Sequence, residues 1–305
     1  MVTWRELWVE TTATVGERTE AMWLCEVAAS AVDRAEFMAM LDEPATERMI
    51  AHLDAMVARL ATGEPLQYVL GQWSFRHIEV AIDRRVLIPR PETELVAGAA
   101  IDKARTFEPS RTVVDLGTGS GVIGLSLAAE LPIDGTTVWI TDASVDALDV
   151  ARANLAGLGR KGRNVRIGEG SWFDAVPADL RFDVIVSNPP YVPAPSDALP
   201  TRGPARAWDA GRDGRVVIDR LIREAPAHLR PGGVLLMVHS DICGIDASLA
   251  GMRDAGLEPD VAARRRGPLG PLMRARVRHL EDHALLEPGA RDEDVAVLRG
   301  QATGA

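Results

Sequence analysis

Three glycines within five residues are the first feature of this sequence that could take part in chemistry. They stand in the segment Asp115–Gly121 (DLGTGSG), between a run typical of a strand and a run typical of a helix. Glycine lets the backbone approach a ligand closely and adopt φ values that other residues avoid. Asp142 follows 21 residues after Gly121, at the end of the next predicted strand, where a carboxylate can accept both hydroxyls of a ribose. Together they predict a site for a nucleoside-type cofactor.

Two other interpretations of the glycine segment remain open. An ordinary tight turn also contains glycines, and Gly124 completes a nominal GxGxxG spacing of the kind found in dinucleotide-binding proteins. Asp115 favours S-adenosylmethionine, because the sulfonium and amino groups of that cofactor are cationic. A pyrophosphate binds best at a helix N-terminus that has no acid nearby.

A second group of polar and rigid residues follows another predicted strand, as Ser187-Asn188-Pro189-Pro190-Tyr191. Two prolines fix the loop. The Asn188 amide both donates and accepts hydrogen bonds, and Tyr191 offers a flat aromatic face. These five residues predict a slot that binds a planar, nitrogen-containing chemical group. The alternative is a rigid turn without chemistry.

The elements that position these residues alternate between strands and helices. Helices are predicted at Val145–Leu155 and Arg215–His228, between short apolar strands. This alternation predicts a parallel α/β sheet covered on both faces. The predicted strands are Thr112–Leu116, Val138–Thr141, Val165–Ile167, Phe182–Ser187, Val234–Val238 and the final EDVAVLRG segment.

The first 63 residues show only helical periodicity. Thr3 and Glu6 form a capping-box pattern, further helices are expected to begin near Thr19 and at Thr46, and Gly63 is a plausible stop. Residues 64–90 alternate β-branched or aromatic residues with polar ones, which predicts a hairpin between two domains. We expect a helical domain over 1–72, a hairpin linker over 73–90 and a catalytic domain over 91–305.

Charge is divided unequally between these parts. Of the formal net charge of −10, residues 1–72 carry −7, from twelve acidic and five basic residues. Such acidity disfavours non-specific nucleic-acid binding, although an RNA partner of the remainder stays open. The acid-free stretch 264–278 carries six arginines, typical of a solvated hairpin or of an RNA-facing surface.

Cysteine content and hydropathy indicate the compartment. Two cysteines, Cys25 and Cys243, cannot form a disulfide framework, and no CxxC pair predicts a metal site. No apolar run is long enough to cross a membrane. We expect a cytoplasmic protein that has no membrane-spanning segment and binds no metal. We also expect it to be a monomer.

The chain resembles a known enzyme family. The pairing of DLGTGSG with NPPY looks like the class I S-adenosylmethionine-dependent amino-methyltransferases. GEPLQYVLG, VLIPRPETELV, DLGTGSG, GSWFDAV and VSNPPYV occur in the order of the HemK/PrmC family, protein-(glutamine-N5) methyltransferases that act on peptide chain release factors. The resemblance covers roughly residues 60–240. It implies a Rossmann-like, seven-stranded, mostly parallel sheet preceded by a helical bundle that docks the substrate.

The resemblance also implies roles for single residues. Asp142 would hold the ribose, Trp172 would lie against the adenine, and Asn188 would touch both cofactor and substrate. Pro189, Pro190 and Tyr191 would complete the substrate slot. The methionine part of the cofactor would be wrapped by Gly117, Thr118, Gly119, Ser120 and Gly121.

Other functions and roles stay open at this stage. The planar slot also fits an exocyclic amino group of an RNA or DNA base, or another protein or small-molecule amide. A silent binding module and a dehydrogenase are remoter alternatives. His239 and Asp241, after a predicted strand, are candidates for substrate contact or for loop structure. Arg90 and Glu92–Glu94 flank a proline that suits a helix start, the alternative being a role beside the cofactor.

Overall fold

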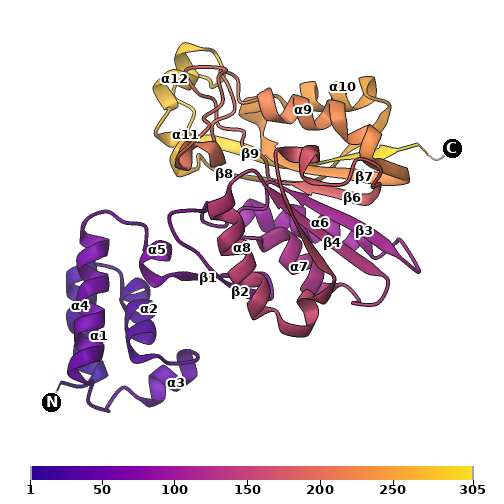
Figure 1. Cartoon of the computed structure of the whole chain (residues 1–305). Coiled ribbons are helices and arrows are strands. Elements are labelled where there is room, and N and C mark those ends of the chain that lie inside the picture. Colours follow the sequence, from indigo (N-terminus) through magenta and orange to yellow (C-terminus); the bar gives the residue numbers. More distant parts are fainter. Residues whose placement is uncertain (1, 304–305) are drawn as a thin grey trace. The chain divides into compact units, whose positions relative to one another are not determined.

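The computed structural model describes residues 2–303 and divides the chain into two compact units, Met1–Trp73 and Ser74–Ala305. Figure 1 shows the elements of both units. No helix within the described residues is both long and apolar enough to cross a membrane.

The first unit is helical, as expected. Thr3 caps the first helix through a complete capping box with Glu6, and Thr46 caps the fourth. Trp4 and Phe37 meet edge to face in the core, with ring centroids 6.0 Å apart. The helices are α1 (Trp4–Val15), α2 (Arg18–Ala29), α3 (Arg34–Ala39), α4 (Glu47–Ala61) and α5 (Leu66–Leu70).

The predicted hairpin over 64–90 is wrong at both ends. Residues 66–70 form α5, which ends at Gly71 with a φ of +75°, and the Arg59 guanidinium binds the carbonyls of Tyr68 and Val69. The hairpin itself consists of only β1 (Gln72–Phe75) and β2 (Ile78–Ala81). The side-chain amide of Asn154 accepts a hydrogen bond from the Ala81 N–H and donates one to the Ala81 carbonyl, so β2 belongs to the second unit.

The second unit contains, besides most of this hairpin, a seven-stranded sheet in the order β5-β4-β3-β6-β7-β9-β8 within the described residues. β9 runs antiparallel to both of its neighbours, β7 and β8, and the other neighbouring pairs are parallel. This confirms the predicted α/β class with a seven-stranded, mostly parallel sheet. Its strands are β3 (Arg111–Leu116), β4 (Thr136–Asp142), β5 (Val165–Glu169), β6 (Phe182–Ser187), β7 (Leu229–Ser240), β8 (Leu257–Pro268) and β9 (Asp292–Ala302).

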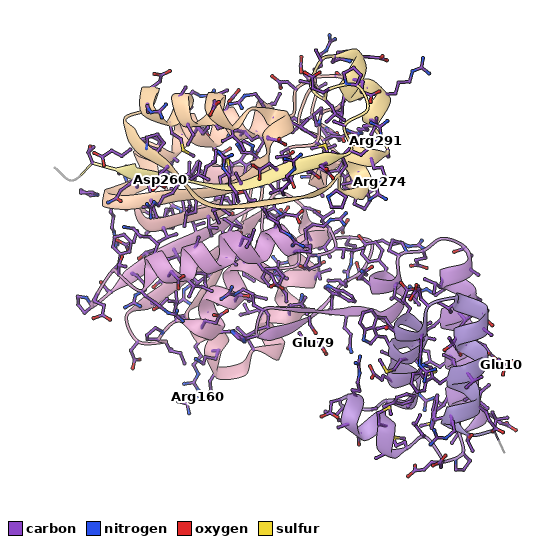
Figure 2. All side chains as sticks on the ribbon, turned by 180° about the vertical axis from the view of Figure 1, so that it is seen from behind. Glu10, Glu79, Arg160, Asp260, Arg274 and Arg291 are labelled. Atoms are coloured by element: carbon purple, nitrogen blue, oxygen red, sulfur yellow. The ribbon has the colours of Figure 1, made fainter. Side chains whose placement is uncertain are left out.

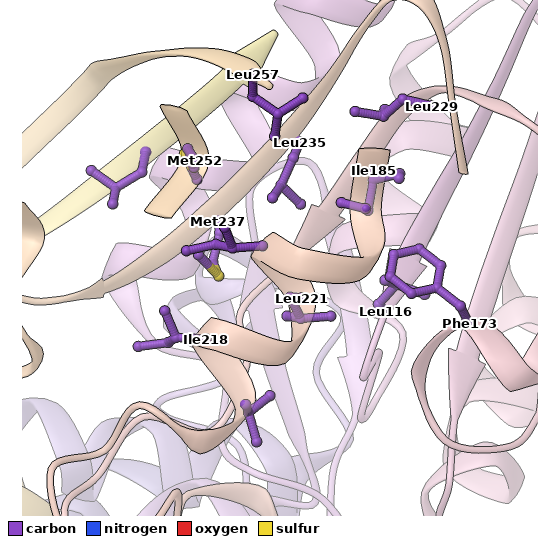
Figure 3. Close-up of a cluster of buried hydrophobic side chains, with 14 of the residues drawn as sticks. Leu116, Phe173, Ile185, Ile218, Leu221, Leu229, Leu235, Met237, Met252 and Leu257 are labelled. Atoms are coloured by element: carbon purple, nitrogen blue, oxygen red, sulfur yellow. The ribbon is translucent and has the colours of Figure 1, made fainter. Parts of the chain in front are cut away.

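Helices cover both faces of this sheet (Figure 1). On one face lie α6 (Pro91–Ala104), α7 (Val122–Glu130) and α8 (Val145–Gly157). On the other lie α9 (Val216–Glu224) and α10 (Ile245–Asp254). Figure 3 shows apolar side chains of β7, α9 and α10 meeting in a buried cluster that fixes this second layer. Short 3₁₀ helices are η1 (Gly159–Asn164), η2 (Trp172–Ala175), η3 (Pro204–Ala207), η4 (Ala225–His228) and η5 (Asp241–Cys243).

The arginine-rich stretch is solvated, as its composition predicts, since all its arginines except Arg276 are exposed, but it does not form one hairpin. Its first part lies in β8, which pairs with β9, and Arg264 binds Asp294 there. The rest enters α11 (Pro271–Arg274) and α12 (Val277–Asp282). Both helices belong to the segment over residues 269–291 that connects β8 to β9, which we call the insertion. Arg276 is held by Asp209 and by the Pro193 carbonyl, 2.5 and 2.6 Å away. Figure 2 shows Arg274 and Arg291 of this insertion at one end of the sheet and Asp260 of β8 at the other.

Candidate active site

The glycine loop connects β3 to α7 at the carboxyl edge of the parallel strands, where ligands of such sheets bind. Gly117 has a φ of +72° and Gly119 one of +56°, values that favour glycine. A Cβ at Gly117 would lie 3.2 Å from the Trp172 ring, whereas Gly119 faces open space. The loop therefore leaves room for a ligand on its outer side.

Asp115 faces neither of the two cavities described below, contrary to the interpretation that its charge attracts a cationic cofactor. It is fully buried. Its Oδ2 accepts hydrogen bonds from the Thr118 hydroxyl and from the Gly124 N–H. Burial raises the pKa of this carboxyl to about 7. Asp115 shapes the loop, because its carboxyl ties both ends of the turn to β3.

A cavity of about 430 Å³ lies along the loop, and we call it the glycine-loop cavity. Asp142, at the end of β4, accepts the Gly119 N–H at 3.0 Å and the Ser144 N–H at 2.8 Å. Burial raises the pKa of Asp142. Trp172 follows β5 and lines the same cavity. The lining includes every residue predicted for the cofactor except Gly121: Gly117, Thr118, Gly119, Ser120, Asp142, Trp172 and Asn188.

A second cavity of about 310 Å³, which we call the Tyr191 cavity, lies beyond Asn188. Pro189 and Tyr191 line it, while Pro190 lines the glycine-loop cavity instead of the predicted slot. Burial raises the pKa of Tyr191, so its phenol is neutral at physiological pH. The insertion supplies much of the opposite wall, through Leu269, Gly270, Pro271, Leu272, Met273 and Arg274.

Asn188 lies where the two cavities meet, because it lines both. It follows β6, whose last residue, Ser187, bonds the Leu116 carbonyl at the end of β3. The Asn188 Nδ2 donates to the Thr93 hydroxyl at 2.9 Å. Thr93 is 4% exposed and lies in the first turn of α6. This bond orients the amide, so that its oxygen is the end left for a ligand.

Comparison with known proteins agrees with this arrangement. Residues 12–71 match the PrmC N-terminal domain, and residues 99–199 match the methyltransferase small domain. A release factor glutamine methyltransferase of Burkholderia pseudomallei is 39% identical over 241 residues, which is 76% of this chain and 82% of the relative. That of Bordetella pertussis is 40% identical over 228 residues, 73% of this chain and 80% of the relative. The chain belongs to the release factor glutamine methyltransferase family.

A Gloeobacter violaceus protein with the same name is 40% identical over 196 residues, 61% of this chain and 67% of the relative. The resemblance to this methyltransferase family, stated above on motifs alone, is thereby confirmed. The family match over residues 12–71 lies within the first unit of the structure.

Thr93 is the site residue that sequence reasoning missed in this family member. The segment RPETE was interpreted as a helix start, with a role beside the cofactor as the alternative, and Arg90 and Pro91 do begin α6. Thr93 and Asn188 are 95 residues apart in the sequence, so spacing carried no signal that they meet. Arg90 also lines both cavities, together with Leu87, Asn188 and Ala207.

Replacing Thr93 by valine is expected to lower kcat about tenfold to a hundredfold, since the Asn188 amide loses its fixed orientation. The affinity for the cofactor, measured by calorimetry, should stay within twofold. Thr93→Ser keeps the hydroxyl and should restore most of kcat. Equal kcat in Thr93→Val and the wild type would contradict the positioning role.

His239 and Asp241 line neither cavity, which favours the alternative of a structural role over that of substrate contact. His239 is fully buried in β7, beside Ala296 of β9. Asp241 accepts hydrogen bonds from the Ser240 hydroxyl and the Asp294 N–H. Asp241 thereby ties the turn after β7 to β9. Across residues 2–303, no three His, Cys, Asp or Glu side chains come together in a group that could hold a metal ion.

Burial lowers the pKa of His239 to about 4, below the value near 6.5 that it has when unfolded. The unfolded chain therefore binds the proton more readily between these values, and stability falls as the pH drops from about 6.5 towards 4. We expect the buried His239 to lower the free energy of unfolding by about 2–3 kcal/mol between pH 7.5 and pH 4.5. Urea unfolding at pH 7.5 and 4.5 should show a smaller loss in His239→Gln. The exposed His52→Gln control should behave as the wild type does.

Proposed function

We propose that this protein transfers a methyl group from S-adenosylmethionine to the side-chain amide nitrogen (N5) of the glutamine in the Gly-Gly-Gln loop of peptide chain release factors. The observation that carries the proposal is the position of Asn188, between a cavity built on the glycine loop and a second cavity lined by Tyr191. The names of the relatives, all release factor glutamine methyltransferases, support the choice of acceptor.

The glycine-loop cavity fits S-adenosylmethionine. The open space beside Gly119 would hold the methionine part, and Asp142, which lines the cavity, would accept hydrogen bonds from the ribose hydroxyls. The Trp172 ring forms a flat wall for the adenine. When bound, S-adenosylmethionine supplies a methyl carbon that the adjoining sulfonium makes electrophilic.

The chain's own residues then have to align and activate a poor nucleophile. The lone pair of an amide nitrogen is delocalised into its carbonyl, so we assign the two amide hydrogens to the Asn188 Oδ1 and the Pro189 carbonyl. These acceptors localise electron density on the nitrogen and point it at the methyl group. Tyr191 packs on the amide plane. As the new N–C bond forms, the C–S bond breaks with its electron pair, and the nitrogen's proton leaves to water.

We assign docking of the release factor to the first unit. Its match to the PrmC N-terminal domain and its net charge of −7 support a surface for a basic partner. Because translation factors work in the cytoplasm and both cysteines are free thiols, we place the protein there.

The test is incubation of the protein with a purified release factor and S-adenosylmethionine labelled in its methyl group, followed by peptide mapping. Label is expected on the glutamine of the Gly-Gly-Gln peptide alone. Label on RNA or DNA instead would favour a base nitrogen as the acceptor. The lining of the Tyr191 cavity disfavours that outcome. Glu92 and Glu293 lie among its arginines, so its surface is not uniformly basic, as a nucleic-acid site would require.

A further inference from the structure

One wall of the Tyr191 cavity carries a buried carboxyl that the proposed methyl transfer does not use. Glu293, at the start of β9, lines this cavity and is only 8% exposed. Its Oε1 accepts the Gly270 N–H at 2.7 Å. Its Oε2 is buried and accepts no hydrogen bond of standard geometry among the residues that the structure describes. The Ser240 hydroxyl interacts with the Glu293 carboxyl but donates its hydrogen bond to Asp241.

An unpartnered carboxylate oxygen is costly inside a protein, because it has lost water without gaining a donor. Such groups are rare, and one on a cavity wall gains a partner if a ligand brings an N–H to it. Burial raises the pKa of Glu293, and the Gly270 N–H and the Ser240 hydroxyl offset only part of this rise. The Glu293 side chain can therefore accept one further hydrogen bond, at its Oε2.

The ligand that meets this oxygen is a neutral donor rather than a cation. Arg90, Arg265 and Arg274 outnumber the two carboxylates of the same lining, Glu92 and Glu293, and this balance disfavours a cationic side chain. A volume of about 310 Å³ also exceeds what the amide end of one side chain fills, so part of the acceptor's backbone enters as well. Flanking glycines suit this entry, since they bring their N–H groups without side chains.

We propose that Glu293 accepts a hydrogen bond from a main-chain N–H beside the methylated glutamine, which makes it a specificity-determining residue of the Tyr191 cavity. This inference rests on the proposed function, because it takes a peptide as the acceptor. It adds a contact that recognises the backbone, in addition to the contacts of Asn188, Pro189 and Tyr191 with the amide.

The first test measures methylation of an intact release factor by Glu293→Gln. Glutamine keeps an oxygen for the Gly270 N–H and places an NH₂ where Oε2 was, so it cannot accept the second bond. KM for the release factor should rise about tenfold, while kcat and cofactor affinity stay within threefold. Glu281→Gln is the matched control: Glu281 accepts the Gly289 N–H in the same insertion but does not line the cavity. It should keep the wild-type KM.

A second measurement does not depend on the folding of any variant. Synthetic peptides of the Gly-Gly-Gln loop, with N-methylglycine at one glycine at a time, compete with the release factor for the wild-type enzyme. One N-methyl peptide should inhibit at least tenfold more weakly than the parent. Equal potency of all peptides, no inhibition by the parent, or an unchanged KM in folded Glu293→Gln would overturn the inference. If the wild type leaves the release factor unlabelled, the proposed function itself fails, and this inference with it.

Discussion

Asn188→Ala is expected to lower kcat about a hundredfold to a thousandfold while the protein still binds S-adenosylmethionine nearly as well as the wild type. The amide oxygen of Asn188 is one of two groups assigned to polarise and aim the acceptor nitrogen, and alanine supplies neither effect. Most of the glycine-loop cavity remains in this variant, because its lining comes from many other residues. Single-turnover methylation and calorimetry with the cofactor separate the two outcomes.

Asn164→Ala is the matched control for the loss of an amide. Asn164 bonds the Thr136 carbonyl at 2.7 Å and lines neither cavity, so this variant should lose stability at most. A kcat for Asn188→Ala within threefold of the wild-type value would refute the mechanism proposed above. Loss of cofactor binding together with kcat would instead assign Asn188 mainly to the cofactor.

The second large effect is expected at Asp142. Replacing it by alanine removes the acceptor assigned to the ribose hydroxyls and frees the Gly119 and Ser144 N–H groups, so the loop loses its own support as well. Hydrogen bonds to a charged group contribute about 1.5–3 kcal/mol each, and losing them should raise the Kd for the cofactor about a hundredfold.

Calorimetric titration with S-adenosylhomocysteine, the demethylated product, measures this change without turnover. Asp146→Ala is the control, because Asp146 is an exposed acid in the first turn of α8 and lines neither cavity. Its Kd should match that of the wild type. A Kd for Asp142→Ala within threefold of the wild-type value would remove Asp142 from the cofactor site.

The parts of the site that follow single strands could be predicted from the sequence. The glycine loop follows β3, Asp142 ends β4 and Asn188 follows β6. Parallel strands bring such residues to one edge, so spacing and residue type were sufficient. The fold class followed for the same reason, from the alternation of strands and helices.

Contacts between distant segments could not be predicted in this way. The bond between Thr93 and Asn188 depends on how α6 packs against the sheet, and a side-chain pair of this kind leaves no periodic signal. Asp115 misled because its charge is visible in the sequence but its burial is not. The half-buried position of Arg276 could not be predicted, because its ion partner, Asp209, is 67 residues away in the sequence.

The meeting of two cavities at one asparagine has a consequence for inhibitor chemistry. A compound that joins an adenosine to a glutamine-like amide through a short linker would pass Asn188 and occupy both cavities at once. Joining the halves makes the second binding event intramolecular, so the compound gains affinity without any new contact. Enzymes that resemble this one only in the part of the site that binds the nucleoside would bind the compound weakly. The selectivity of such a bisubstrate compound would therefore come from the Tyr191 cavity and the insertion that forms its wall.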